Sequence, residues 1–397
     1  MKAIAYREAR GLTPGWLALL GGLAGLVALG LGAAWYMEHH GHHVTGMNNQ
    51  VVWGMPHVFA VFLIVAASGA LNVASIASVF GKTAYKPLAP LSGLLAVALL
   101  AGGLMVLVLD LGRPDRLIVA MTHFNFRSIF AWNVLLYTGF FAVVAAYLWV
   151  MMDRRRARWV KPAGLAAFLW RLILTTGTGS IFGFLAARDA YDSAIMAPLF
   201  IAMSFSFGLA VFLLVLMAAC RMTDRPLGDG LARILGSLLA VFVAAVLYFV
   251  AVQHLTNLYI AGRQGVEAFI LLNGGVYTVL FWGVQIVLGG LVPLALLLHP
   301  GLSANRTNLA LAAALVIVGG MAQIYVIVIG GQAYPLNIFP GMEVTASSFF
   351  DGRVGGYAPT AAETLLGIGG VALAMAIVAL GATVLRFLPV TLADEAE

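Results

Sequence analysis

Long apolar stretches alternate with short polar ones along the whole chain. Ten of these stretches are apolar enough, and about long enough, to cross a bilayer as helices. They lie near residues 15–37, 53–80, 88–110, 128–151, 163–187, 194–220, 231–256, 268–298, 308–330 and 363–388. The segment 331–362 is too short and too glycine-rich to bury a core of its own. The pattern predicts an all-α polytopic membrane protein, with residues 1–397 forming one integral membrane domain.

The composition agrees with this pattern. Of 397 residues, 62% are hydrophobic and 10% are charged, whereas soluble domains have about 25% charged residues. The net charge of +6 is dispersed over short loops, so it does not indicate a nucleic-acid partner. The single cysteine, Cys220, excludes an internal disulfide and any cluster held by four cysteines. If the protein handles electrons, a partner or a diffusible cofactor has to carry them.

The distribution of Lys and Arg predicts the orientation. Loops on the side of the N-terminus hold most of these residues, which places that side in the cytoplasm. An even number of spans then puts both termini there. Seven of the eight histidines are expected at the outer face, where we expect the polar ends of several helices to converge on one site.

The stretch 109–133, between the third and fourth spans, is unusually polar for the end of a membrane bundle. Ionisable groups there are costly unless they are paired or hydrated. We interpret the stretch as the rim of a pocket; the alternative is an ion-paired loop that only closes a hairpin. Asp115 and Arg116 suit local pairing, whereas Asp110, nearest the apolar run, is the better functional candidate.

Trp53 and His57 open the second span, which continues with small and apolar residues. A quinone needs such an apolar slot, with a titratable hydrogen-bonding group beside its oxygens. A tryptophan of the interfacial aromatic belt beside a histidine is an equally good interpretation.

Polar residues also occur inside the spans. Arg171 needs a carboxylate, carbonyl groups or water, and together with Gln285 and Gln323 it could line a polar track. The candidate proton path consists of Asp110, Arg171, Gln285 and Glu363. The cluster His39–His43 is too loose to predict a metal site. A haem b between His57 and His254 is disfavoured, because both residues lie at the rim.

Several short motifs occur in a characteristic order. They are Trp53-Gly54, Leu109–Pro114, His123-Phe124-Asn125 with Ser128, Phe281-Trp282, Gly330–Pro335, and Pro359-Thr360 with Glu363. With these motifs the chain resembles the NrfD/polysulfide-reductase membrane-subunit family. It is most similar to the ten-span branch, which includes hydrogenase subunits of the HybB type and sulfur-metabolism subunits of the DsrP type.

The resemblance implies two four-helix bundles, spans two to five and six to nine, flanked by spans one and ten. It also implies a quinone or quinol (menaquinone or ubiquinone) near the outer face of a bacterial cytoplasmic membrane. His57 matches a quinone-contacting histidine of the family, Tyr137 is the candidate tyrosine, and Gly54 stands where some members carry Asn. The expected quinone-binding set is Trp53, His57, Asp110, Arg113, His123, Asn125, Tyr137 and His254.

The resemblance further implies that the chain is the quinone-interacting subunit of a redox complex. Its partner would be a ferredoxin-like iron–sulfur subunit, joined in the sulfur-metabolism branch by a multihaem cytochrome c and a haem b membrane subunit. Two alternatives stay open from the residues alone: a proton- or ion-translocating subunit, and a passive membrane anchor.

Overall fold

The computed structural model describes residues 4–9, 13–336 and 352–393. Within this part of the chain, ten helical spans are long and apolar enough to cross a membrane. They consist of α1 (Pro14–His40), α2 (Met55–Ala70) with α3 (Asn72–Ser78), α4 (Ala89–Leu109), α6 (Ile129–Met152), α7 (Val160–Gly183), α8 (Met196–Met222), α9 (Asp229–Tyr259), α11 (Val276–Val279) with η7 (Leu280–Leu291) and α12 (Val292–Leu298), α14 (Arg306–Tyr325) with η8 (Val326–Gly330) and α15 (Gly331–Ala333), and α16 (Ala361–Val384). The prediction of an all-α polytopic membrane protein is confirmed.

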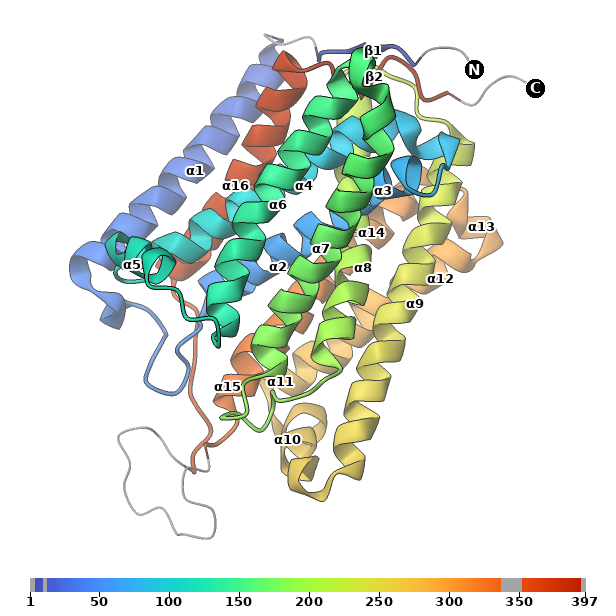
Figure 1. Cartoon of the computed structure of the whole chain (residues 1–397). Helices are drawn as coiled ribbons and strands as arrows, with labels where there is room; N and C mark the ends of the chain where they lie inside the picture. The colour runs from blue at the N-terminus through green and yellow to red at the C-terminus, as the bar shows by residue number, and fades with distance from the viewer. Residues whose placement is uncertain (1–3, 10–12, 337–351, 394–397) are drawn as a thin grey trace.

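Shorter elements connect the spans or extend them. They are β1 (Tyr6–Arg7), η1 (His42–Val44), η2 (Thr83–Leu88), η3 (Pro114–Arg116), α5 (Leu117–Thr122), η4 (Arg154–Trp159), η5 (Ala261–Arg263), α10 (Gln264–Ala268), η6 (Phe269–Asn273), α13 (Pro300–Ser303) and β2 (Leu388–Pro389). Figure 1 shows α10, α11 and α15 at the end of the bundle opposite β1 and β2.

Helix starts follow ordinary capping chemistry. The Thr13 hydroxyl accepts a hydrogen bond at the start of α1, and Ser128 does the same for α6. Thr360 and Glu363 form a capping box at the start of α16. Pro56 lies in the first turn of α2, where its missing N–H costs no helical hydrogen bond.

The spans pack as two bundles. Helices α2, α4, α6 and α7 form the first bundle, and α8, α9, α14 and the α11–η7–α12 span form the second. Helix α16 packs against α4 and α1, so α1 is outermost (Figure 1). This arrangement agrees with the predicted pair of bundles and their flanking helices.

The two bundles meet where α2 crosses α8. At the crossing, Gly69 faces Gly208, and a Cβ on Gly69 would overlap the carbonyl oxygen of Ser204. Small residues allow such close backbone approach in membranes, where van der Waals packing holds helices together. These two glycines therefore set the distance between the bundles.

The two ends of the protein come together at one end of the bundle. Strand β1 pairs antiparallel with β2, with Tyr6 opposite Pro389 and Arg7 opposite Leu388. Burial raises the pKa of Tyr6, whose hydroxyl donates to the Lys86 carbonyl, to about 12. The pairing agrees with an even number of spans; the cytoplasmic side of this end stays a prediction.

The eighth span begins later than its apolar window. The window starts near residue 268, but η6 ends at Asn273 and the spanning helix starts at Val276. Between them, Gly275 has a φ of 59°, a left-handed conformation that glycine adopts without a Cβ clash. The segment before this break folds back as α10 and η6.

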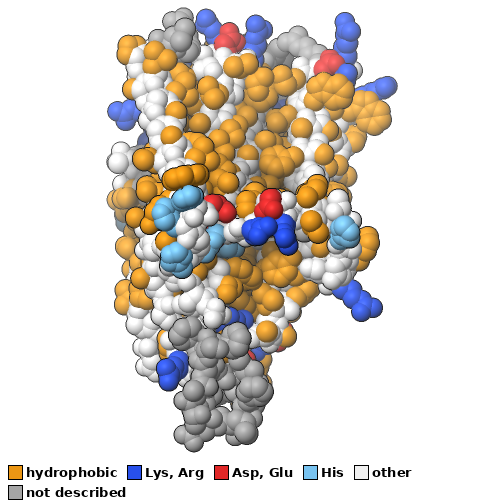
Figure 2. Space-filling view, turned by 90° about the vertical axis from the view of Figure 1, so that its left-hand side faces the viewer, with side chains coloured by type: hydrophobic (Ala, Val, Ile, Leu, Met, Phe, Trp, Pro, Cys, Tyr) orange, Lys and Arg blue, Asp and Glu red, His pale blue; other side chains and the backbone are white. Residues whose placement is uncertain are grey.

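The surface agrees with a membrane environment. Large hydrophobic side chains such as Leu29 and Trp35 of α1 are exposed. Figure 2 shows hydrophobic side chains over most of the face that carries α1 and α5, with Lys and Arg at the end that carries the strands. A row of histidine, basic and acidic side chains crosses this face at mid-height.

Candidate functional site

A cavity of about 470 Å³ lies in the first bundle, between α2, α4, α6 and α7. The short helix α5 and Val328 of η8 contribute to its walls. Most lining side chains are apolar or aromatic. The polar lining residues are His57, Asn133, Tyr137, Thr138 and Thr178. Ligand sites in proteins combine an apolar wall with a few orienting polar groups in this way.

His57 connects this cavity to a buried carboxylate. Its Nδ1 lies 2.9 Å from Oδ2 of Asp110, the C-cap residue that follows α4. The other carboxylate oxygen, Oδ1, lies 3.9 Å from Nε2 of His42. The Asp110 side chain is fully buried, whereas that of His42 is 28% exposed. His42 and Asp110 both line an open groove of about 340 Å³ on the surface. Asp110 therefore lies between the apolar cavity and the solvent-facing groove.

Trp53 is held in the cavity wall by its backbone. Gln332 is 1% exposed, and its Oε1 accepts hydrogen bonds from Val52 N (2.9 Å) and Trp53 N (3.0 Å). Its Nε2 donates to Trp53 O (3.0 Å) and Val328 O (2.8 Å). The Trp53 ring stacks on His57 with 6.0 Å between ring centroids. Gln332 thus positions the start of the second span from the end of the ninth.

The loop between α7 and α8 supports the same wall. Arg188 donates to the Gln332 carbonyl (3.2 Å), and burial lowers the pKa of this guanidinium. Tyr191 donates to the Val328 carbonyl (2.7 Å) and stacks on Trp53 with 6.5 Å between centroids. Burial raises the pKa of Tyr191, so its phenol stays a hydrogen-bond donor at neutral pH.

Glu363 is fully buried and joins the start of α16 to the loop before α2. Its Oε2 accepts from Gly46 N (2.9 Å), Thr360 N (2.7 Å) and Thr360 Oγ1 (2.9 Å), and its Oε1 accepts from Tyr357 (2.8 Å). Burial and the Glu363 charge raise the pKa of Tyr357. A Cβ at Gly54 would overlap Glu363 Oε1, which explains the glycine where some relatives were expected to carry Asn. Glu363 therefore acts as a clamp, because its carboxylate holds the start of α16 and Tyr357 against the loop before α2.

Of the expected quinone-binding residues, Trp53, His57 and Tyr137 line the cavity and Asp110 contacts it through His57. The remaining residues lie elsewhere. Arg113 is exposed and pairs with Asp115 at 3.3 Å. His123 and Asn125 are exposed beside α5, and their described partners are local. His254 lines a different cavity. The polar helix ends therefore separate into two sites instead of meeting at one.

Arg171 joins α7 to the second span. Its Nη2 donates to Asn72 Oδ1 at 2.9 Å, and its guanidinium lies 4.7 Å from the ring centroid of Phe205 in α8. Within the described residues, no hydrogen bond or ion pair joins any two of the four candidate proton-path residues, which lie in four separate environments. Arg171 therefore connects the two bundles, because it contacts Asn72 in the first and Phe205 in the second.

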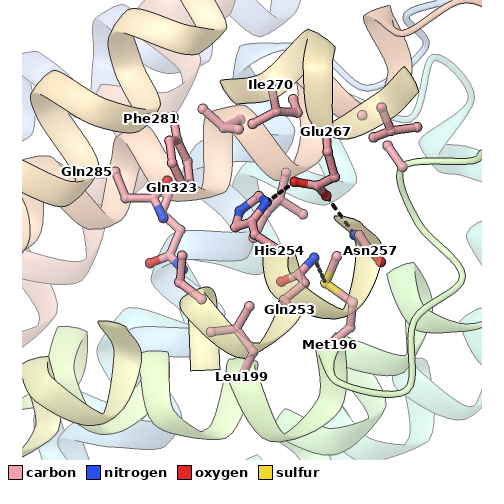
Figure 3. Close-up of a pocket in the computed structure, with 16 residues that line it drawn as sticks. Met196, Leu199, Gln253, His254, Asn257, Glu267, Ile270, Phe281, Gln285 and Gln323 are labelled. Atoms are coloured by element: carbon pink, nitrogen blue, oxygen red, sulfur yellow. Dashed lines mark hydrogen bonds and ion pairs between the residues drawn. The ribbon is translucent and has the colours of Figure 1, made fainter. Parts of the chain in front are cut away.

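A second, smaller cavity lies in the second bundle, with a volume of about 40 Å³ (Figure 3). His254 Nδ1 lies 2.6 Å from Glu267 Oε2, and Asn257 donates to Glu267 Oε1 at 2.8 Å. Gln285 and Gln323 line the same cavity. Since His57 and His254 line different cavities, they do not form a facing pair for a haem. Within residues 4–9, 13–336 and 352–393, no group of three His, Cys, Asp or Glu side chains is placed to hold a metal ion.

Sequence reasoning missed three contributors. Gln332 lies in the Gly330–Pro335 motif, but the motif does not indicate its role, because Trp53, whose backbone it holds, lies 279 residues away in sequence. Tyr191 lies in a short loop with no distinguishing pattern. Glu267 lies at the edge of the eighth apolar window, and its pairing with His254 depends on the turn over Ala261–Arg263, which folds α10 back against α9. A carboxylate beside an apolar window is a signal that could have pointed to Glu267.

Comparison with known proteins gives a consistent result. A protein of Archaeoglobus fulgidus, named the integral membrane subunit of an Hdr-like menaquinol oxidoreductase, is 29% identical over 395 residues, 99% of each chain. A Halobacterium salinarum protein provisionally named as a membrane subunit of dimethyl sulfoxide reductase is 30% identical over 94% of this chain and 91% of its own. One of the chains of the Wolinella succinogenes polysulfide reductase is 25% identical over 72% of this chain and 96% of its own.

The family pattern described as polysulphide reductase, NrfD, matches residues 43–335. The match covers both bundles and the motifs around Asp110, and it confirms the resemblance inferred from the sequence. The chain therefore belongs to the NrfD family of polysulphide reductase membrane subunits.

Proposed function

We propose that the first-bundle cavity binds a quinone or quinol and that the chain is the quinone-reactive membrane subunit of a multi-subunit redox complex. The names of two relatives, one from a menaquinol oxidoreductase and one from a polysulfide reductase, support this proposal. Menaquinol is the species named for the archaeal relative, so it is the first candidate ligand.

The main support for the proposal is that an apolar cavity has His57, paired with Asp110, in its wall. A quinone needs a slot for an apolar ring and tail, and about 470 Å³ lies within the range of ordinary ligand pockets. Its oxygens need hydrogen-bonding groups, which His57, Tyr137 and Thr178 provide in the wall. The residues present therefore fit the cofactor.

A bound quinol supplies two electrons and two protons when it is oxidised. His57 is placed to accept a proton: Nδ1 faces Asp110, which leaves Nε2 as the ring nitrogen for a ligand oxygen. The Asp110 carboxylate, 2.9 Å from Nδ1, orients the ring, as the carboxylate of a catalytic triad does behind its histidine. His42, beyond Asp110, continues the route to the open groove.

The electrons have to leave through a partner, because Cys220 alone cannot hold an iron–sulfur cluster. We assign this role to a ferredoxin-like iron–sulfur subunit and place the complex in sulfur metabolism, with support from the polysulfide reductase relative. A multihaem cytochrome c and a haem b subunit are the further partners to look for. We also propose that the protein lies in a bacterial cytoplasmic membrane with the cavity in its outer half; the Lys and Arg distribution supports the outer side.

The test uses the purified complex with a His57→Ala substitution. The variant should assemble with its partners but lose quinol-coupled electron transfer by about a hundredfold or more, the usual effect of removing an acid–base group. His123→Ala is the matched control, because His123 is exposed outside the cavity, and it should keep full activity. Full activity in His57→Ala would contradict the proposal.

A further inference from the structure

The second bundle contains a polar site that the quinone proposal does not use. Figure 3 shows Glu267 between His254 and Asn257, with Gln285 and Gln323 on the opposite side of the imidazole. Glu267 is 1% exposed and Asn257 is 4% exposed, so the carboxylate lies in the protein interior. Burying a carboxylate is costly unless hydrogen bonds and an opposite charge compensate it. Asn257 donates a hydrogen bond to Glu267 at 2.8 Å, and His254 Nδ1 lies 2.6 Å from its other oxygen.

The charged groups around this site form a short series that ends at the surface. The cavity wall is formed by residues of α8, α9, α10, η6, η7, α14, η8 and α15. Among these lining residues, the titratable side chains are His254 and Glu267. Asn257 Oδ1 accepts a hydrogen bond from Arg263 at 3.3 Å, and Arg263 pairs with Asp192 at 3.3 Å. Glu267 therefore connects an exposed ion pair to the cavity interior.

One side of the cavity has an unsatisfied hydrogen-bonding group. Gln323 is 3% exposed, and its Nε2 has no hydrogen-bond partner among the described residues. A buried amide without a partner has lost its hydration without any compensating hydrogen bond, so it normally contacts water or a ligand. Gln285 and Gln253 bring two further amides to the same cavity.

The space at this site matches water. A volume of about 40 Å³ holds about two or three water molecules at ~15 Å³ each, and it is too small for a quinone. Gln285 and Gln323 also line a third cavity, of about 20 Å³, which lies beside Gly289 and Gly319 in the same bundle. Polar partners and sufficient room are the two conditions for buried water, and both are met.

The small cavity and the large one share an element. Val326 and Ile327 of η8 face the small cavity, whereas Val328, the next residue, faces the large one. Both η8 and η7, which carries Gln285, are π-helical segments. Such segments are rare and are frequently found at functional sites.

We propose that the second bundle binds water in this small cavity and that His254, oriented by Glu267, exchanges a proton with that water. In the step, the Nε2–H bond of the imidazolium breaks and an O–H bond forms on a water held by Gln285 and Gln323. The positive charge moves from the ring to the water, and the Nδ1 proton stays between His254 and Glu267. The reverse step restores the imidazolium, so no other reactant is needed.

The test is nuclear magnetic resonance on the full-length chain in lipid nanodiscs, with ¹⁵N-labelled histidine rings. The wild-type spectrum should contain a ring signal that disappears in His254→Gln and whose Nε2 proton exchanges with water. Glu267→Gln should shift the Nδ1 signal, because a neutral amide replaces the carboxylate. This signal reports the site without any quinone.

The decisive variant is Gln323→Leu, which removes the amide but keeps a side chain of similar size. Exchange at His254 should slow about tenfold, the factor expected when a water loses one hydrogen bond. Gln264→Leu makes the same change at the exposed Gln264 and should leave the rate unchanged. If Gln323→Leu does not fold, Gln285→Leu has to show the same slowing. An absent water exchange in wild type, or equal rates in the cavity variant and Gln264→Leu, would overturn the proposal.

Discussion

His57 Nδ1 lies 2.9 Å from Asp110 Oδ2, although the two residues belong to different spans, near the start of α2 and at the end of α4. The pair stands between the apolar cavity and the groove that contains His42. It brings a titratable ring to the cavity and a buried carboxylate behind it. Chemistry at the proposed quinone site should therefore depend on Asp110, which does not itself line the cavity.

Asp110→Asn should separate the positioning role of Asp110 from ligand binding. The amide keeps the shape but removes the charge that orients His57, so we expect kcat to fall about 10–100-fold while KM for quinol changes little. Steady-state kinetics of the purified complex measure both values. Asp115→Asn, at an exposed ion pair, is the control and should resemble wild type. A changed KM with normal kcat would place Asp110 in binding instead.

Thr138→Trp should obstruct the cavity. Thr138 lines it from α6 and is exposed toward the outside of the bundle, so a large ring there should raise KM for quinol about tenfold or more. Thr256→Trp is the matched control, since both threonines are exposed and both hydroxyls bond the carbonyl four residues earlier. Equal KM values in the two variants would show that ligand does not enter beside Thr138.

Tyr357→Phe should change how the stability of the protein depends on pH above about 10. The pKa of Tyr357 is raised in the folded protein, so above pH ~10 the unfolded chain loses this proton while the folded chain keeps it. Folding is then progressively disfavoured as pH rises. We expect Tyr357→Phe to be less stable at pH 7 by about 1 kcal/mol, through the lost bond to Glu363, but to decline less steeply above pH 10. Thermal unfolding across this pH range measures both effects, and parallel curves would contradict the assignment.

Gly208→Leu should separate the bundles. A Cβ at this position would overlap the backbone of Gly69, and backbone cannot move aside as a flexible side chain can. We expect a loss of several kcal/mol of stability or no folded protein, beyond the usual 1–3 kcal/mol of overpacking. Gly22→Leu, where nothing lies within 4 Å of an added Cβ, should be tolerated. Fluorescence-detected size exclusion of both variants makes the comparison.

The sequence predicted the spans well, because twenty apolar residues in a row have few alternatives in a bilayer. It also identified His57 and Asp110 as functional candidates. It did not show that they pair, since helix rotation and depth depend on packing. His254 illustrates the limit: its place at the outer end of a span suggested the quinone site, but α9 belongs to the second bundle and Glu267 is its partner.

Long-range clamps were also beyond sequence reasoning. Glu363 was expected on a proton path because a carboxylate near a membrane is costly. In the structure it accepts hydrogen bonds from Gly46, Tyr357 and Thr360, so both carboxylate oxygens have partners within this clamp. Gln332 likewise holds Trp53 through partners that no local pattern indicates. The buried polar residues could be recognised from the sequence, but their partners decided what they do.

The most direct test of the quinone site is photolabelling of the purified complex with an azido-menaquinone, followed by mapping of the labelled peptides. We expect labels on the cavity walls, in residues 53–64, 104–121 and 130–138, and their loss in Thr138→Trp but not in Thr256→Trp. Labels confined to α9, α10 or α14, or unchanged by Thr138→Trp, would show that the quinone binds elsewhere.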